Sequence, residues 1–490
     1  MPPDAIAGAL VLGGGTDGTS RSYDATTQPV GHWWRSSRHV AVLATVMWAS
    51  TWWGEHLGQL APLRWYSLAI LVVAVVFRAQ WRLILVSAAL VGLSGGSDAW
   101  NGNPSVQVGD CNGIAVVRKD PTWVGAGVGT VLEIRQQRFK VIAYGSPGRR
   151  LAARLTGESV RITGTCMPLS GSFTRYDSIT HVVGRINVTS VSEEFGEGSL
   201  LGRASNRMRR ALVQGVHSMS QDTKALFTGL IIGDDRDQSR EMVMQFRGTG
   251  LSHLTAVSGQ NVAFLLAVCA PLLSRRRPFG RWCLTMGILV WFVVLTRAEP
   301  SVLRAAVMAG VIATNTARRS AMNARTVLSL TVCVLLIVDP MLAWSVGFGL
   351  SVGATAGLAW LSAPLGRIVG SHGMLASTLA AQVGTFPITW GVFQNLPVIA
   401  LIANPLALAV AGAVMMIGLP LALLAAVVPQ LEPLISLLLS VPVIWVASVA
   451  RVLSNISPRG PWNAVCWVLV LCVLVWRWQQ VEAKRRSVAM

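Results

Sequence analysis

The chain has 490 residues, of which 52% are hydrophobic and only 13% charged, and its 41 Lys and Arg against 22 Asp and Glu give a formal net charge of +19. An ordinary soluble domain carries about 25% charged residues, so this chain has too few charges to solvate a globular surface. The composition excludes a cytosolic enzyme and an acidic disordered chain, and it predicts a polytopic membrane protein. The seven cysteines are too few for a disulfide scaffold.

Residues 1–38 form a segment rich in Gly, Thr and Ser that ends in arginines. The segment lacks the short apolar core and the cleavage site of a secretory signal, so we expect a disordered cytoplasmic tail. Residues 39–97 are predicted to form three transmembrane helices, at 39–57, 61–77 and 83–97. The third run is short for a span and needs tilt or bilayer thinning to cross. Basic residues flank these runs on alternate loops, so the positive-inside rule places the chain outside after the third span.

Residues 98–197 are predicted to be an extracytoplasmic β domain. Apolar and polar residues alternate, and turn-forming residues recur at short intervals, as in a small antiparallel barrel. The alternating stretches lie at 106–108, 114–116, 128–134, 139–143, 160–162 and 181–191. This size and strand number fit a five-stranded OB-like barrel. Cys111 and Cys166 in this domain either form a disulfide in an oxidising compartment or remain free thiols, because spacing alone does not show proximity.

Residues 198–250 are predicted to form amphipathic helices. Apolar residues recur at helical spacing near the start of this segment, interleaved with four basic residues, namely Arg203, Arg207, Arg209 and Arg210. These arginines are candidates for contact with DNA or with anionic lipid headgroups, and both alternatives stay open. Two shorter helices are expected to follow, over 223–232 and 239–247.

Residues 251–478 are predicted to form the main transmembrane domain. We expect nine spans, near 251–273, 282–297, 301–316, 326–338, 343–361, 374–396, 398–427, 433–455 and 462–478. Together with the first three they make about twelve spans. The basic loops then fall inside, with both termini in the cytoplasm and a basic cytoplasmic tail at 479–490.

Two polar groups interrupt the apolar spans. The first places six polar residues within ten positions: Ser252, His253, Thr255, Ser258, Gln260 and Asn261. Unpaired polar groups in hydrocarbon cost several kcal/mol each, so this run favours a lined cavity over ordinary core packing. The second group, Arg297, Glu299 and Arg304, lies at a membrane boundary, either as a functional site or as an ion pair that locks two helices. Because Glu299 would repel a phosphate, we expect it to orient an arginine.

Several ordered motifs in this region resemble the signature of ComEC-type competence proteins. The motifs are Ala225–Gly233, Phe246–Val262, Glu299–Ala306, Asp339-Pro340, Gly347–Ser351, Phe386-Pro387 and Asn404-Pro405. The upstream order of short spans followed by an OB-like domain is also similar to that family. The resemblance implies a channel that carries single-stranded DNA inward during natural transformation, with the polar groups at 252–261 and 297–304 as pore candidates.

The resemblance also implies partners: single-stranded DNA, membrane lipids, a DNA receptor, a separate nuclease, and a cytoplasmic helicase or DNA-processing protein. Many family members carry a metallo-β-lactamase-like domain after the last span, and we expect this chain to lack it. The seven histidines contain no His-x-His-x-Asp-His run, so no zinc site, other metal site or cofactor is expected.

Two other functions compete with the channel. An intramembrane enzyme would need a nucleophile and a base that face each other, but Ser258 and His253 are five residues apart and point in different directions on one helix. We therefore expect no enzyme activity. A small-solute or lipid permease of unknown substrate would show twofold internal repetition, and none is apparent in the sequence.

Overall fold

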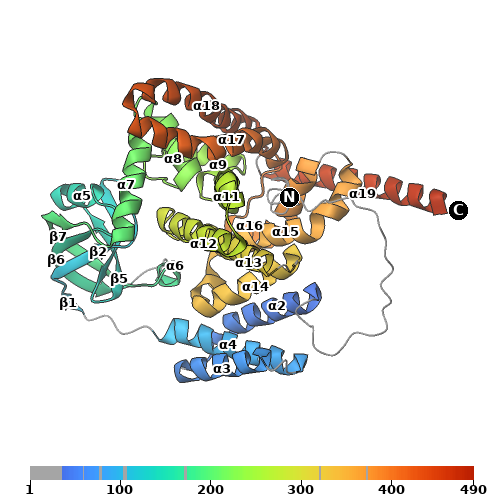
Figure 1. The fold of residues 1–490 in the computed structure, drawn as a ribbon, viewed down its shortest axis with the longest axis horizontal. Helices are drawn as coiled ribbons and strands as arrows, with labels where there is room; N and C mark the ends of the chain where they lie inside the picture. The colour runs from blue at the N-terminus through green and yellow to red at the C-terminus, as the bar shows by residue number, and fades with distance from the viewer. Residues whose placement is uncertain are drawn as a thin grey trace.

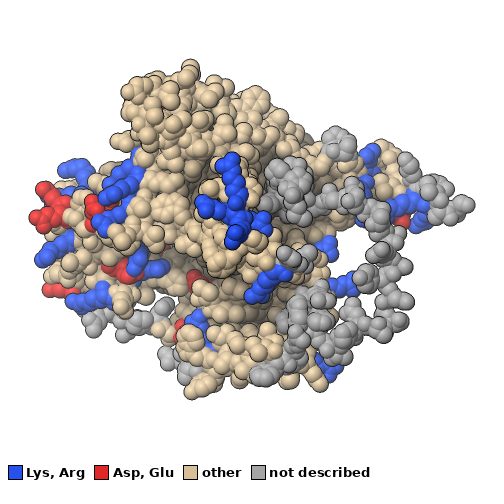
Figure 2. Space-filling model, viewed as in Figure 1, with Lys and Arg blue, Asp and Glu red and all other residues tan. Residues whose placement is uncertain are grey.

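The structure is a computed structural model that describes residues 36–58, 60–76, 80–102, 108–169, 174–318, 320, 322–370, 373–458 and 460–489. A small β-barrel lies at one end of a larger assembly of helices (Figure 1). Most of the predicted N-terminal tail lies outside the described residues, and its last two positions already belong to helix α2. Charged side chains of both signs gather over the barrel, whereas those visible over the helices are mostly basic (Figure 2).

Five strands of the β domain form a closed ring in which β2 pairs with β4, β4 with β5, β5 with β7, β7 with β6, and β6 with β2. All of these pairings are antiparallel except that of β5 with β7. The strands are β1 (Gly109–Asp110), β2 (Gly113–Val117), β3 (Thr122–Val124), β4 (Gly127–Ile134), β5 (Gln137–Ala143), β6 (Ser159–Pro168) and β7 (Val182–Gly196). Helix α5 (Gly145–Ala152) follows the third strand of the ring, and α6 (Thr174–Ile179) precedes the last. A five-stranded closed barrel of this kind is consistent with the OB-like domain expected from the sequence.

The barrel core consists of alternate residues of the ring strands, whose side chains point inward. Val117, Leu132, Val141 and Ile162 are among them and are almost fully buried. Five predicted strands correspond to β2, β4, β5, β6 and β7, whereas β1 and β3 are too short to give an alternating pattern. Most of the stretch at 106–108 lies outside the described residues. The structure joins Cys111 and Cys166 in a disulfide whose Cα atoms are 5.5 Å apart, so of the two alternatives the paired one is present.

Three helices connect the barrel to the apolar bundle: α7 (Leu200–Gln214), α8 (Gln221–Ile232) and α9 (Arg240–Gly248). A serine caps the N-terminus of each one and accepts a hydrogen bond from a backbone N–H in the first turn. Helix α7 buries one face, through Ser205, Arg209 and Leu212, and α9 buries one through Met242 and Phe246, whereas α8 is buried from Ala225 to Ile232.

The remaining helices are α2 (Ser37–Gly54), α3 (Ala61–Val76), α4 (Trp81–Asn101), α10 (Ser252–Thr255), α11 (Gly259–Ser274), α12 (Pro278–Leu295), α13 (Pro300–Ala317), α14 (Ala324–Val338), the 3₁₀ turn η2 (Pro340–Trp344), α15 (Val346–Val369), α16 (Gly373–Phe393), α17 (Ala400–Val427), the 3₁₀ turn η3 (Pro429–Leu431), α18 (Glu432–Ile456) and α19 (Pro461–Ala489). In the part of the chain that the structure describes, six helices are long and apolar enough to cross a membrane: α4, α12, α15, α17, α18 and α19. Three shorter apolar helices lie at 63–76, 259–274 and 324–338. The protein is therefore of the membrane type, while the count of about twelve spans stays a prediction.

Two differences from the predicted elements have local causes. The span expected over 251–273 is divided into α10 and α11, because the backbone is extended at Ala256 and Ser258 between them. The tail expected at 479–490 continues α19 as a helix through Ala489.

The helices pack around two hydrophobic cores. One joins α7–α9 to α11–α13, α17 and α18, and the other joins α2–α4 to α14, η2 and α15. Helices α15 and α16 approach each other so closely that a Cβ atom at Gly357 would overlap the carbonyl oxygen of Ala380. A Cβ atom at Gly384 would likewise overlap the carbonyl oxygen of Gly353. Small residues at such contacts let the backbones of membrane helices come together.

Candidate functional site

A group of buried charges lies where the barrel meets the helices. We call Asp120, Arg209, Asp234, Arg236 and Arg297 the junction cluster. Asp120 precedes β3 of the barrel, and Arg297 lies in the turn between α12 and α13. The Asp120 carboxylate accepts hydrogen bonds from Arg297 Nε at 3.0 Å and Arg297 Nη2 at 3.2 Å. This bidentate pair joins residues 177 positions apart, and it fixes the barrel to the end of α12.

Arg209 of α7 completes the cluster. Its Nη2 atom lies 3.3 Å from Asp120 Oδ2 and 3.0 Å from Asp234 Oδ2, while its Nη1 atom donates to the carbonyl oxygen of Leu295 at 3.0 Å. The side chain of Arg209 is only 4% exposed. Arg236 closes the other side with two hydrogen bonds to Asp234, at 2.7 and 2.6 Å. Each carboxylate thus lies between two guanidinium groups.

Local backbone geometry places these side chains. Gly233 ends α8 in the left-handed conformation with φ of 67°, which turns the chain so that Asp234 faces Arg209. Arg297 and Ala298 also have positive φ values, 61° and 54°. Non-glycine residues adopt such values at a cost of about 1–3 kcal/mol each, so the surrounding contacts must hold this turn in place.

The electrostatics keep the two carboxylates ionised. Burial raises the pKa of Asp120, but the charges of Arg297 and Arg209 and the hydrogen bonds from Thr156 outweigh it and lower this pKa to about 2. Burial also raises the pKa of Asp234, and the hydrogen bonds and charge of Arg236, together with the charge of Arg209, lower it overall. The cluster therefore stays charged throughout the neutral and mildly acidic range.

The four arginines of α7 differ in burial and in their ion-pair partners. Arg209 is buried within the junction cluster, so its assignment as a contact for DNA or lipid does not fit the structure. Arg210 pairs with the buried Glu158 of the barrel at 2.6 Å, and Arg203 lies 3.4 Å from Glu197. Of the four, Arg207 is exposed on the outer side of the helix and has no ion-pair partner among the described residues.

The polar run at 252–261 lies at the break between α10 and α11. Ser252, His253 and Gln260 are exposed, whereas Thr255 and Ser258 are half-buried. His253 Nδ1 lies 3.1 Å from the carbonyl oxygen of Gly250, and the Thr255 hydroxyl donates to that of Ser252 at 3.1 Å. These two side chains thus bond to backbone carbonyl groups at the start of α10.

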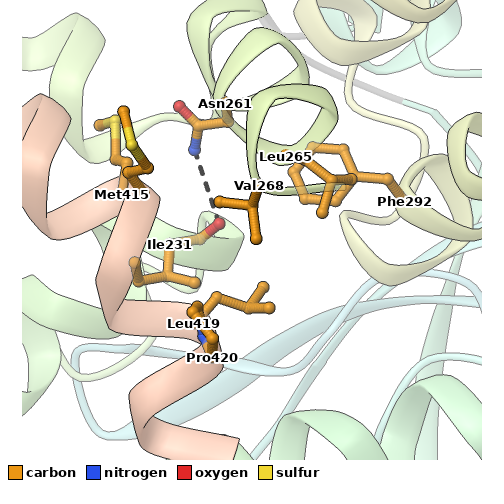
Figure 3. A pocket seen from close by; sticks show the side chains of 9 residues that line it. Ile231, Asn261, Leu265, Val268, Phe292, Met415, Leu419 and Pro420 are labelled. Atoms are coloured by element: carbon orange, nitrogen blue, oxygen red, sulfur yellow. Dashed lines mark hydrogen bonds between the residues drawn. The ribbon is translucent and has the colours of Figure 1, made fainter. Parts of the chain in front are cut away.

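Asn261 has a structural task. It is only 4% exposed, and its side-chain amide donates to the carbonyl oxygen of Leu230 at 2.9 Å, while the Ser258 hydroxyl donates to Asn261 Oδ1 at 3.2 Å. The last carbonyl groups of a helix have no partner within it, so Asn261 stabilises the C-terminus of α8. Figure 3 shows this amide turned toward Ile231, with Met415 and Leu419 of α17 around the same cavity. The cavity leaves about 20 Å³ for the centres of water molecules, which is room for about one water and not for a nucleotide.

Arg304 of α13 is buried, with 7% of its surface exposed. Its Nε donates to the Ser351 hydroxyl of α15 at 2.7 Å, and its Nη1 lies 3.0 Å from the sulfur of Met308. The guanidinium also packs against Gly259 at the start of α11, where a Cβ atom would lie 2.8 Å from Nη2. No Asp or Glu of the described residues lies within 4.0 Å of it. Arg304 is thus a buried cation with neutral partners where α11, α13 and α15 meet.

Glu299 does not orient an arginine, contrary to the prediction. It is exposed, and among the described residues no arginine lies within ion-pairing distance of it. Asp120 and the side-chain oxygen of Asn206 take that role for Arg297 instead. Sequence reasoning missed both Asp120 and Asp234, because no spacing rule links these residues to Arg209 and Arg297.

The fold and the site define a helical membrane-type protein with a fused barrel held by buried ion pairs. Residues 230–481, half of the chain, match the family described as Competence protein. The chain therefore belongs to the Competence protein family.

One similar curated protein is ComE operon protein 3 of Bacillus subtilis (strain 168). It is 26% identical over 269 residues, which cover 54% of this chain and 34% of that protein. The chain thus matches about a third of the length of this relative. No solved structure matches the chain.

Proposed function

We propose that this protein is a multi-pass channel of the cytoplasmic membrane that carries single-stranded DNA inward. Membership of the Competence protein family supports DNA as the partner. In this proposal the barrel lies outside, both termini lie in the cytoplasm, and about twelve segments cross the membrane. A DNA receptor, a separate nuclease and a cytoplasmic helicase or DNA-processing protein complete the pathway, and the protein itself catalyses no reaction.

The observation that carries the proposal is the buried Arg304. Burying a charge without an ionised partner costs desolvation free energy, so binding of an anion would stabilise this guanidinium. The phosphates of a single strand supply such anions at regular intervals and are what a non-specific channel must bind. Arg304 lies in the second turn of α13, whose first residues follow the turn that holds Asp120 of the barrel.

A DNA-uptake assay in a deletion strain tests the role of Arg304. Cells that carry Arg304→Gln should internalise labelled strand more than about tenfold less than the wild type, while surface-bound duplex persists. Arg304→Lys should retain part of the uptake, because it keeps the charge. Arg247→Gln, which removes an exposed arginine of α9, is the matched control and should transport normally. Normal uptake by Arg304→Gln at wild-type abundance in the membrane would contradict the proposal.

The placement of the barrel has its own test. A membrane-impermeant thiol reagent should label Cys111 and Cys166 on intact cells after mild reduction. Labelling that requires disrupted membranes would instead place the barrel in the cytoplasm.

A further inference from the structure

An open groove with a free volume of about 580 Å³ runs between α12 and α13 and reaches α14. Most of its lining is apolar, from Met286 and Val290 of α12 to Ala306 and Gly310 of α13. Its lining along α13 extends from Leu303 to Arg318, the residue that follows the helix, a length of about 22 Å at 1.5 Å per residue. One leaflet of a bilayer contributes about 15 Å of hydrocarbon, so the groove has the length for an extended acyl chain.

The groove changes character at one end. There Thr314, Asn315 and Arg318 line it, whereas the opposite end is formed by Leu303 and Val294. The Trp282 indole donates to Thr314 Oγ1 at 3.0 Å, which brings the beginning of α12 beside this polar end, and Arg281 precedes Trp282 in the chain. An apolar slot with hydrogen-bonding groups and cations at one end matches the shape of a phospholipid.

The charges at the polar end have no acidic partner in the part of the chain that the structure describes. In the sequence from 278 to 338 the only acidic residue is Glu299, which lies beyond the apolar end of the groove. Neither Arg281 nor Arg318 has a side-chain ion pair or hydrogen bond among the described residues, and Arg318 is exposed. A further basic residue of this region, Arg325, already donates to the carbonyl oxygen of Ala359 and lies over Trp360.

We propose that this groove is a binding site for an anionic phospholipid, with one acyl chain along α12 and α13 and the phosphate at Arg318. Basic pockets between transmembrane helices recognise anionic headgroups in this way. The site is separate from the junction cluster and from Arg304, and it does not depend on DNA transport. A zwitterionic lipid of the same chain length would fill the groove without using the excess positive charge.

The test is native mass spectrometry of the full chain, purified in detergent and supplied with phosphatidylglycerol or with phosphatidylcholine of matched chains. The wild type should retain phosphatidylglycerol preferentially. Arg318→Gln should weaken this retention about fivefold and leave phosphatidylcholine unchanged. Arg367→Gln, which removes an exposed arginine at the end of α15, is the matched control and should bind both lipids like the wild type.

A second variant distinguishes binding of the acyl chain in the groove from simple attraction of the headgroup to Arg318. A Cβ at Gly310 would lie 3.6 Å from the terminal methyl of Met286, so Gly310→Leu is tolerated and fills the groove. It should reduce retention of both lipids, whereas Gly287→Leu, where a Cβ would meet nothing within 4 Å, should not. Diazirine-labelled phosphatidylglycerol should crosslink mainly to α12 and α13. Equal retention by Gly310→Leu and Gly287→Leu, or crosslinks spread evenly over the helices, would overturn the proposal.

Discussion

Replacing Asp120 with Asn should loosen the barrel from the helices, because Asp120 is the carboxylate that both Arg209 and Arg297 share. Its pKa falls from 3.8 to about 2 in the folded protein. This lowering corresponds to roughly 2.5 kcal/mol of stabilisation by the ionised form. Since the folded-state pKa is the lower one, the stabilisation is complete above about pH 4 and is lost only as the pH falls toward 2. At pH 7 the substitution should therefore have its full effect.

Hydrogen exchange can report this loosening directly. The Thr156 amide donates to Asp120 Oδ1 at 2.8 Å, so its exchange follows the opening of the junction. In the purified protein at pH 7, the peptide that contains Thr156 should exchange roughly 60-fold faster in Asp120→Asn. Because Arg297→Gln removes the same contact from the other side, the double variant should be little worse than either single one.

Glu133→Gln provides the control, because it breaks the pair of Glu133 with Arg118, whose side chain is 44% exposed. Exposed pairs contribute at most about 1 kcal/mol, so exchange at Thr156 should change less than about fivefold. Two results would refute the reasoning: additive effects of Asp120→Asn and Arg297→Gln, or an exchange rate in Asp120→Asn no faster than in Glu133→Gln.

Three further substitutions test other contacts. Asn261→Leu should lower the melting temperature in detergent by several degrees, because leaving buried carbonyl groups of α8 without a donor costs about 1–3 kcal/mol; an unchanged Tm would mean that water replaces the amide. Gly357→Leu should abolish the yield of monodisperse protein, whereas Gly366→Leu on the same helix, where a Cβ meets nothing within 4 Å, should not. Cys166→Ser should destabilise the barrel by about 4 kcal/mol, the loop-closure value for its separation of 55 residues, and expose it to protease. The exposed free thiol Cys283 gives the control Cys283→Ser, and equal protease resistance of the two variants would count against a structural disulfide.

Local patterns in the sequence predicted much of the fold. Alternation located the five ring strands, since the residues facing the barrel core repeat every second position. Helical spacing located α7, and apolar runs located most of the later helices. The break between α10 and α11 was visible only as a run of polar residues, because periodicity does not show which of them bond to the backbone.

The site depended on contacts that no local pattern contains. Arg209 and Arg210 are adjacent in a basic helix, yet Arg209 is buried between two carboxylates, whereas Arg210 is exposed and pairs with Glu158. The difference comes from Asp120 and Asp234, which reach Arg209 from separate elements. Likewise, Asn261 was identified as a pore candidate for its polarity, whereas its partner is the end of a helix thirty residues earlier.

The barrel contacts both groups of packed helices, but through attachments of unequal strength. Near α12 and α13 the junction cluster is buried. Near α2 and η2 the attachments are the pair of Arg175 with Glu55 at 2.7 Å and the contact of His181 with Asp339 at 3.1 Å, in which Arg175 is 59% and His181 45% exposed. Exposed pairs break at a cost of about 1 kcal/mol or less, whereas breaking a buried one costs several. Mechanical load on the barrel would thus break its contacts with α2 and η2 first. The barrel would then rotate about its remaining attachment at Asp120.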